Sequence, residues 1–169
     1  MDASVLLVDP KYAHNVGNAL RACALLGAHD LFWTGDRVPP PSQWPEGARL
    51  PREERLKCYD RTRLEHLGAT PNLDLLPGYT PVCIEIVDGT EDLRDFEHPE
   101  QALYVFGPED GDVPKGVRSH CHRFVRIPAW EPDERTPYNL ASAVCMVLYD
   151  RLLKATRGVP VALAAERSE

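Results

Sequence analysis

The sequence predicts an α/β domain built on a parallel sheet, and two observations carry this prediction. The chain has 169 residues, the length of one domain, and a chain of this size buries roughly 70% of its unfolded surface, enough for a core without disulfides. Within residues 5–35, an apolar run, an amphipathic stretch and a second apolar run follow one another. Strand, helix and strand at this spacing form a βαβ unit, whose two strands are parallel.

Each element of this unit has its own sequence signal. The run VLLVDP at 5–10 is apolar on both faces, which is typical of a buried parallel strand. A helix is expected over 15–27, where apolar residues recur at helical spacing, with Asn15 as its cap and Gly27 as its end. Residues 29–35, HDLFWTG, are expected to form the second strand.

The middle of the chain has no clear periodicity. Residues 36–79 are rich in Pro and Arg and are expected to be irregular. A short helix is expected only over 52–57, with Pro51 in its first turn.

Three further strands and a helix are expected in the second half. The strands are predicted at 80–89, 102–107 and 124–129, because each is a short apolar run bounded by turn residues. An apolar stripe predicts a long amphipathic helix over 139–155, and residues 158–169 are expected to fray.

Charge and hydropathy exclude several classes of protein. The net charge of −7 argues against a protein that binds nucleic acid by bulk charge alone. The acidity is local, because residues 81–114 hold ten acidic residues and one basic residue. No apolar run approaches the roughly 20 residues of a membrane helix, and the first ten residues do not resemble a secretory signal.

The five cysteines predict neither a disulfide framework nor a metal site. Their odd number and wide spacing indicate free thiols and a cytoplasmic location. Cys23, Cys83 and Cys145 lie in apolar runs and are expected in the core. The tract His120-Cys121-His122 is not expected to bind metal, because adjacent residues do not share a face.

Polar residues follow three of the predicted strands, in loops 9–21, 106–114 and 127–141. Ligands of open parallel sheets bind beyond the carboxyl ends of the strands, so these loops are candidate binding loops. Neither glycine-rich phosphate motif, GxGxxG or GxxxxGK[ST], is present.

Four side chains in these loops stand out, and each also has a purely structural explanation. Asn15 and Asn139 are placed to cap helices, Arg21 could be a solvated helix residue, and Glu109 could belong to an acidic surface turn. Taken singly, none of the four specifies a function.

The order and spacing of the motifs are more specific than any one of them. The sequence contains N-x-G-N-x-x-R-x-x-x-x-x-G, then F-G-P-E-x-G, then R-I-P, then N-L-x-x-A-V. This set resembles the SpoU/TrmH family of SPOUT-class RNA ribose 2′-O-methyltransferases, over about residues 5 to 155. The resemblance implies a SPOUT-type parallel sheet flanked by helices, with a C-terminal deep trefoil knot. It also implies S-adenosylmethionine as cofactor and a homodimer with the C-terminal helix in its interface.

The resemblance assigns roles to individual residues. It implies that Arg21 is the catalytic arginine, and it places Asn15, Glu109 and Asn139 beside it as active-site residues. It implies that the cofactor is held by backbone groups at Glu85, Gly107, Ile127 and Leu140, next to walls formed by Ile86 and Pro128. Arginine stays protonated in proteins, so Arg21 is expected to grip an RNA phosphate rather than to act as a base. No metal is expected.

The chain differs from the family pattern at two positions. Pro137 stands two residues before Asn139, where the family usually has Ser. Asp112 stands in the loop G-P-E-D-G-D, where a second glycine is common.

The domain expected is a single methyltransferase domain over 1–157, followed by a tail over 158–169. A bare catalytic domain resembles the family members that act on transfer RNA. The segment 49–63 holds six basic and three acidic residues, and Arg52, Arg55, Tyr59 and Arg61 are candidates for RNA contact. Its alternative is a solvated helix with internal ion pairs.

Alternative functions remain open at this point. They are a ribosomal RNA methyltransferase, a non-catalytic RNA-binding dimer of the same fold, and an unrelated α/β nucleotide-binding module.

Overall fold

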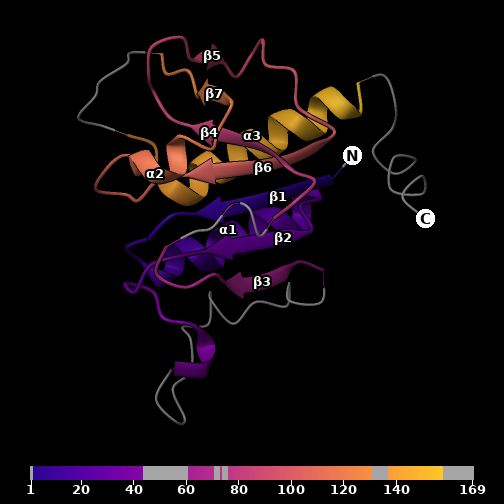
Figure 1. Cartoon of the computed structure of the whole chain (residues 1–169). Coiled ribbons are helices and arrows are strands. Elements are labelled where there is room, and N and C mark those ends of the chain that lie inside the picture. The colour runs from indigo at the N-terminus through magenta and orange to yellow at the C-terminus, as the bar shows by residue number, and fades with distance from the viewer. Residues whose placement is uncertain (1, 44–60, 71–72, 74–75, 131–136, 158–169) are drawn as a thin grey trace.

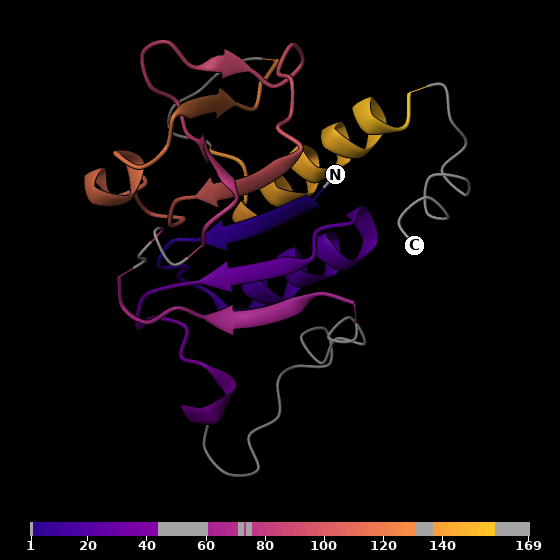
Figure 2. The ribbon, with the colours of Figure 1, turned by 45° about the vertical axis from the view of Figure 1, so that its right-hand side comes forward.

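The structure is a computed structural model, which describes residues 2–43, 61–70, 73, 76–130 and 137–157. Its centre is a seven-stranded sheet in the order β3-β2-β1-β6-β4-β7-β5, in which every pair of neighbouring strands is parallel. The strands are β1 (Asp2–Leu7), β2 (Asp30–Trp33), β3 (Arg63–His66), β4 (Thr80–Ile84), β5 (Glu91–Asp92), β6 (Gln101–Phe106) and β7 (Arg123–Arg126). Figure 1 shows the order, and Figure 2 shows the arrows of β3, β2, β1 and β6 pointing the same way.

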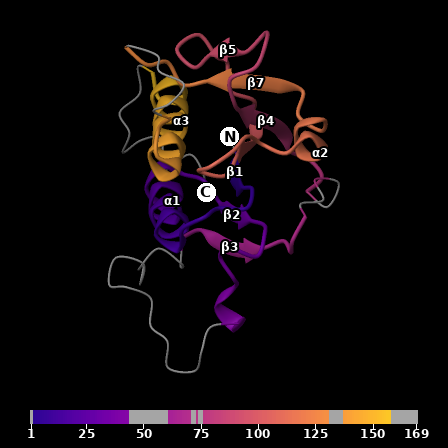
Figure 3. The ribbon, with the colours of Figure 1, turned by 90° about the vertical axis from the view of Figure 1, so that its left-hand side faces the viewer.

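Helices cover both faces of the sheet. The long helices α1 (Ala13–Leu26) and α3 (Leu140–Ala155) pack side by side on one face, and the short α2 (Lys115–Arg118) lies on the other (Figure 3). A 3-10 turn, η1 (Pro41–Gln43), follows β2. The predicted parallel α/β architecture is therefore confirmed.

The apolar character of the central strands follows from this two-sided cover. Along β1, Val5 and Leu7 join the core beneath α1 and α3, and Leu6 joins the core on the α2 face. Successive residues of a strand point to opposite faces, so a strand covered on both sides needs an unbroken apolar run. The strand ends before Asp9, whose positive φ of 47° breaks the extended conformation.

The two long helices form where they were expected, but one cap was predicted wrongly. Gly27 ends α1 in the left-handed conformation, with φ of 81°, as predicted. Asn15 is not the cap of α1: the helix begins at Ala13 after Tyr12, and Asn15 lies buried in its first turn. Asn139 does cap α3, because its side chain accepts from the N–H groups of Ala141 and Ser142.

Several short elements were not predicted. The strand β3 lies in the region expected to be irregular, β5 has two residues, and α2 has four. The strand expected over 80–89 ends at Ile84. The helix expected over 52–57 and the tail at 158–169 lie outside the described residues.

Cys145 corrects a further expectation. Cys23, Cys83 and Cys121 are buried free thiols, but Cys145 is exposed on α3, because its position on the helix faces away from the sheet. In the part of the chain that the structure describes, no helix is long and apolar enough to cross a membrane.

The strand order places the loops after β1 and β6 side by side at the carboxyl ends of the central strands. From β1 the sheet extends through β2 to β3, and from β6 it extends the other way through β4 and β7. Connections that leave neighbouring strands in opposite directions open a crevice between them. The candidate loops 9–21 and 106–114 both begin at this crevice.

Candidate functional site

Three of the predicted side chains form one hydrogen-bonded chain at the crevice. Asn139 Nδ2 donates to Asn15 Oδ1 at 3.0 Å, and Asn15 Nδ2 donates to Glu109 Oε1 at 2.5 Å. The other oxygen of Glu109 accepts from the backbone N–H of Lys11 at 2.7 Å. The two side-chain pairs are 124 and 94 residues apart in sequence, so the fold alone brings this Asn15–Glu109–Asn139 network together.

The direction of each bond in the network follows from the start of α3. Asn139 Oδ1 accepts from the backbone N–H groups of Ala141 at 3.0 Å and Ser142 at 3.3 Å, so the amide nitrogen of Asn139 is the group left to meet Asn15 Oδ1. Asn15 must then donate through its own nitrogen, and an ionised Glu109 can only accept. The helix start therefore fixes the orientation of all three side chains.

Burial explains why Asn15 needs both partners. Its relative exposure is 1%, and a buried amide without hydrogen bonds costs free energy. Asn15 lies on the same face of α1 as the buried Ala19 and Ala22, but the local sequence gives no sign of the distant side chains that bind it.

A cavity of about 530 Å³ lies beside the network, in the size range of small-molecule sites. Its lining comes from the ends of β4 and β6, the loop after β6 and the start of α3. The lining residues are Ile84, Glu85, Ile86, Phe106, Gly107, Pro108, Glu109, Asp110, Gly111, Asp112, Pro137, Tyr138, Leu140 and Ala143.

The carboxylate of Glu85 holds the loop after β6 against the end of β4. Its two oxygens accept from the backbone N–H groups of Ile86 at 3.1 Å and Val113 at 3.0 Å. The same loop passes so close to Gly107 that a Cβ there would lie 2.9 Å from the nitrogen of Val113. Glycine is therefore required at 107 by close backbone approach.

Four of the six residues expected to bind cofactor line this cavity, namely Glu85, Ile86, Gly107 and Leu140. Ile127 and Pro128 are not among the residues that line it. Ile127 packs against the core beneath α1 and α3, and the carbonyl of Pro128 accepts from the hydroxyl of Tyr138 at 2.9 Å. Tyr138 itself lines the cavity, and it connects Pro128 to the cavity wall.

Both departures from the family pattern lie at the cavity. Asp112 and Pro137 line it. Asp112 does not need a glycine-like conformation, because Asp9 is the one described non-glycine residue with positive φ. Pro137 has neither a hydroxyl nor an N–H, so it can offer only apolar contact and its carbonyl.

A cluster of ions that sequence reasoning missed fixes the same loop from outside. Arg37 Nη1 lies 2.8 Å from Asp110 Oδ1, and Arg37 Nε lies 3.0 Å from Asp9 Oδ2. Lys11 Nζ lies 3.3 Å from Asp110 Oδ2. The hydrogen bond from Arg37 holds the pKa of Asp110 below its ordinary value, with a smaller contribution from Lys11. The loops after β1, β2 and β6 are thereby tied together.

Two of the remaining predicted residues are exposed in the structure. Arg21 is exposed on α1, six residues after Asn15. Arg61 is exposed just before β3, and Arg52, Arg55 and Tyr59 lie outside the described residues. Within the described ranges no group of three or more His, Cys, Asp or Glu residues is placed to hold a metal ion.

Comparisons with known proteins place this geometry in a family. The model of the SpoU rRNA Methylase family matches residues 2–149. No curated protein matches the chain.

Solved structures share the fold at low sequence identity. The SpoU methyltransferase AviRb from Streptomyces viridochromogenes is 20% identical, with a TM-score of 0.73, and the match covers 93% of this chain and 61% of AviRb. The TrmH/SpoU tRNA modifying enzyme of A. aeolicus is 18% identical, with a TM-score of 0.71, and the match covers 91% of this chain and 76% of that enzyme. A protein solved for insight into the 2-OH methylation of C/U34 on tRNA is 21% identical, with a TM-score of 0.69, and the match covers 92% of this chain and 97% of that protein.

This chain thus spans about three fifths of the length of AviRb, which has also been crystallised with the cofactor AdoMet. The family match extends from the start of β1 into α3 and includes the loops that carry Asn15, Glu109 and Asn139. On this match, the chain belongs to the SpoU rRNA Methylase family.

Proposed function

We propose that this protein transfers a methyl group from S-adenosylmethionine to a ribose 2′-hydroxyl of RNA. The observation that carries the proposal is the Asn15–Glu109–Asn139 network at the edge of the 530 Å³ cavity. Its three side chains come from three separate motifs of a methylase family.

The chemistry of the cavity suits this cofactor. Four carboxylates line it, from Glu85, Glu109, Asp110 and Asp112, and none of the described lining residues is basic. A cationic sulfonium is attracted to such a site, and the apolar side chains of the lining suit an adenine ring. In this proposal the backbone at Glu85, Gly107 and Leu140 holds the cofactor and Ile86 forms a wall. Pro128 acts through its contact with Tyr138.

When bound, S-adenosylmethionine supplies an electrophilic methyl group, so the protein must align the ribose oxygen and ease the loss of its proton. Glu109 is held by two donors, and each of its oxygens retains a further acceptor site. We place the ribose hydroxyl against this carboxylate. Asn15 and Asn139 act as positioning residues that keep Glu109 in place.

Arg21 is proposed to bind the RNA phosphate next to the reacting ribose. Its positive charge would stabilise the oxygen as negative charge develops there. Replacing Arg21 with Lys keeps the charge but removes the two-pronged hydrogen bonding of the guanidinium. We expect Arg21→Lys to lower kcat/KM for RNA on the order of tenfold, with cofactor affinity unchanged by calorimetric titration. Full turnover in this variant would contradict the role.

The substrate class is proposed to be transfer RNA. In support, one of the matched structures is that of a protein solved for insight into the 2-OH methylation of C/U34 on tRNA, and the match covers 92% of this chain. We further propose that the segment 49–63, with Arg52, Arg55, Tyr59 and Arg61, contacts the RNA.

Methyl transfer from labelled S-adenosylmethionine to bulk transfer RNA and ribosomal RNA, followed by mapping of the modified nucleotide, tests the function. Label on a ribose of transfer RNA is the expected result. Label on ribosomal RNA alone would favour the other substrate class. Cofactor binding without transfer to either RNA would favour a non-catalytic RNA-binding protein.

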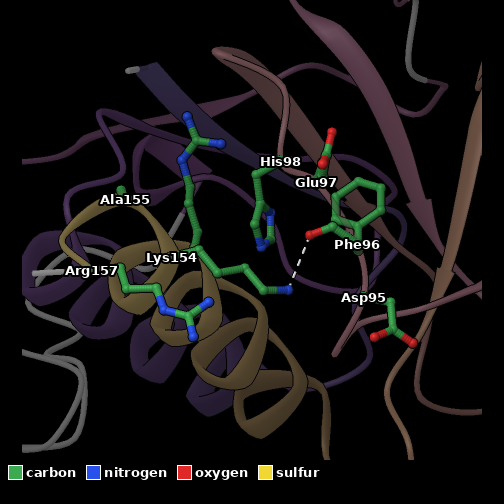
Figure 4. A pocket seen from close by; sticks show the side chains of 8 residues that line it. Asp95, Phe96, Glu97, His98, Lys154, Ala155 and Arg157 are labelled. Atoms are coloured by element: carbon green, nitrogen blue, oxygen red, sulfur yellow. Dashed lines mark hydrogen bonds between the residues drawn. The ribbon is translucent and has the colours of Figure 1, made fainter.

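The C-terminal knot of the family is proposed here as well. In support, the chain between β5 and β6 holds α3: Lys154 Nζ donates to the carbonyl of Leu93 at 2.6 Å. It also donates to the carbonyl of Phe96 at 3.0 Å (Figure 4). Arg151 Nη1 donates to the carbonyl of Pro99 at 2.7 Å. Contact between α3 and this segment is what threading of the helix past it requires.

A further inference from the structure

A second cavity lies on the other side of the loop after β6. It has a volume of about 640 Å³ and opens at the carboxyl ends of β1 and β2, on the face of the sheet that carries α2. Its lining residues are Val8, Asp9, Gly35, Asp36, Arg37, Ala69, Thr70, Pro114, Gly116, Val117 and His120. None of the residues predicted from the family motifs contributes to it.

The lining combines apolar walls with a polar edge. Val8 and Val117 are buried residues of the core on the α2 face, and Ala69 and Pro114 add further apolar surface. Such a surface is suited to the flat faces of an aromatic ring.

The polar groups of the cavity are mainly acceptors. The side chain of Asp36 is exposed and has no hydrogen-bond or ion-pair partner among the residues that the structure describes. His120 Nδ1 lies 2.8 Å from the carbonyl of Gly116, so Nδ1 carries the proton and a neutral ring offers Nε2 as an acceptor. A ligand that presents N–H groups at one edge matches this lining.

A phosphate group does not match it. The arginine of the cavity, Arg37, is already bound to the carboxylates of Asp9 and Asp110, and Asp36 adds a further negative charge. A neutral planar ring with N–H groups at its edge fits these charges, and an anion would be repelled.

The two cavities share a wall. Asp110 lines the first cavity, Arg37 lines the second, and the pair is joined at 2.8 Å. The loop after β6 borders the first cavity from Gly107 to Asp112 and reaches the second at Pro114. A polymer that lies across this loop can reach both cavities at once.

We propose that the second cavity binds a nucleobase of the RNA substrate, with Asp36 accepting a hydrogen bond from the base edge. This inference rests on the proposed function, because it assumes that RNA crosses the loop after β6. It adds a binding site for a base to the proposed binding sites for the ribose, the phosphate and the cofactor.

Gly116 permits a direct test of this proposal. A Cβ added at Gly116 meets no atom within 4 Å, so the position accepts a side chain that projects into open space. In Gly116→Leu the side chain occupies part of the cavity. Gly116→Ala is the matched control, because it makes the same backbone change and leaves the cavity open. Both variants should keep the wild-type melting temperature or exceed it, since replacing glycine in a helix reduces the entropy of the unfolded chain.

The measurements are RNA affinity by filter binding, KM for bulk RNA in the methyl-transfer assay, and S-adenosylmethionine affinity by calorimetry. We expect Gly116→Leu to weaken RNA binding and raise KM roughly tenfold, with cofactor affinity unchanged, and Gly116→Ala to match the wild type. Equal RNA binding and KM in the two variants, with an active wild type, would overturn the base-binding site alone. A wild type that neither binds nor methylates RNA would overturn the proposed function and this inference together.

Discussion

At the scale of single residues, the direction of the hydrogen bonds in the Asn15–Glu109–Asn139 network is its most testable property. Asn15 presents its oxygen to Asn139 and its nitrogen to Glu109, and both ends are needed because the side chain is buried. Asn15→Asp removes the donor and sets two carboxylates against each other, at a site where the present contact is 2.5 Å. We expect a loss of about 2 kcal/mol in the free energy of unfolding, measured by urea denaturation.

The reciprocal substitution supplies the control. In the double variant Asn15→Asp with Glu109→Gln, the glutamine amide can donate to the new carboxylate, so the hydrogen bond is restored with its direction reversed. Stability should return toward the wild type, while methyl transfer stays low because the carboxylate at 109 is lost. Additive losses of stability in the double variant would mean that the two side chains are not coupled.

Sequence reasoning identified these three residues and could not have found their neighbours. Asn15, Glu109 and Asn139 stand in motifs with recognisable spacing. Lys11 and Arg37 stand outside these motifs, and Asp110 fills the position that the motif F-G-P-E-x-G leaves open. The ion pair of Arg37 with Asp110 spans 73 residues. A charged residue in a loop gives no local sign of a distant partner, so only the fold reveals which ones hold the site together.

At the scale of elements, the C-terminal half of α3 is fixed by a buried histidine (Figure 4). The hydroxyl of Tyr104 accepts from Arg151 Nη1 at 3.0 Å and lies 2.6 Å from His98 Nδ1. His98 Nε2 donates to Asp150 Oδ2 at 2.8 Å, because a carboxylate can only accept. The same oxygen of Asp150 lies 2.7 Å from Lys154 Nζ.

The burial of the His98 ring makes stability depend on pH. Burial lowers the pKa of His98 from its ordinary value of 6.5, although the carboxylate of Asp150 acts in the opposite direction. The nearby cations Lys154 and Arg151 also lower it, and Tyr104 has a pKa raised to about 12 and stays neutral. Below pH 6.5 the unfolded chain therefore binds a proton that the folded chain resists.

We expect the free energy of unfolding to fall as pH decreases from about 6.5 toward the lowered pKa of His98, as measured by urea denaturation between pH 5 and 8. His98→Gln removes the titrating ring and should flatten this part of the profile, whatever its effect on stability at pH 8. An unchanged slope in this variant would assign the pH dependence to other groups.

The length of an element decided whether it could be predicted. The strands β1, β2 and β6 and the helices α1 and α3 carry apolar patterns long enough to specify their type. The strand β3 has four residues, RLEH, that are exposed or half-buried at the sheet edge, so no apolar run marks it. Asn15 was predicted to cap α1 because Asn favours the capping position. In the structure it lies inside the first turn, where its side chain forms hydrogen bonds with Glu109 and Asn139.

At the scale of the whole molecule, α1 and α3 lie together on one side of the sheet (Figure 3), and both carry exposed apolar residues. Leu25 on α1 is 67% exposed, Tyr149 and Leu153 on α3 are 52% and 51% exposed, and Cys145 on α3 is also exposed. Large exposed apolar residues that gather on one face are typical of protein interfaces. The resemblance implies that the C-terminal helix lies in a dimer interface, and we propose that this face of α1 and α3 joins two copies of the chain.

Leu153→Glu tests this arrangement, because the side chain is exposed in a single chain and makes little contribution to its folding. If the face joins two copies, the substitution buries two carboxylates without partners. The wild type should then elute with twice the chain mass of 18.9 kDa in size exclusion with light scattering, and Leu153→Glu should elute with the mass of one chain.

Lys115→Glu, on α2 across the sheet, is the charge-changing control and should leave the mass unchanged. A folded Leu153→Glu variant that keeps the wild-type mass would place the interface elsewhere, since a glutamate at its centre could not be accommodated without separating the two copies.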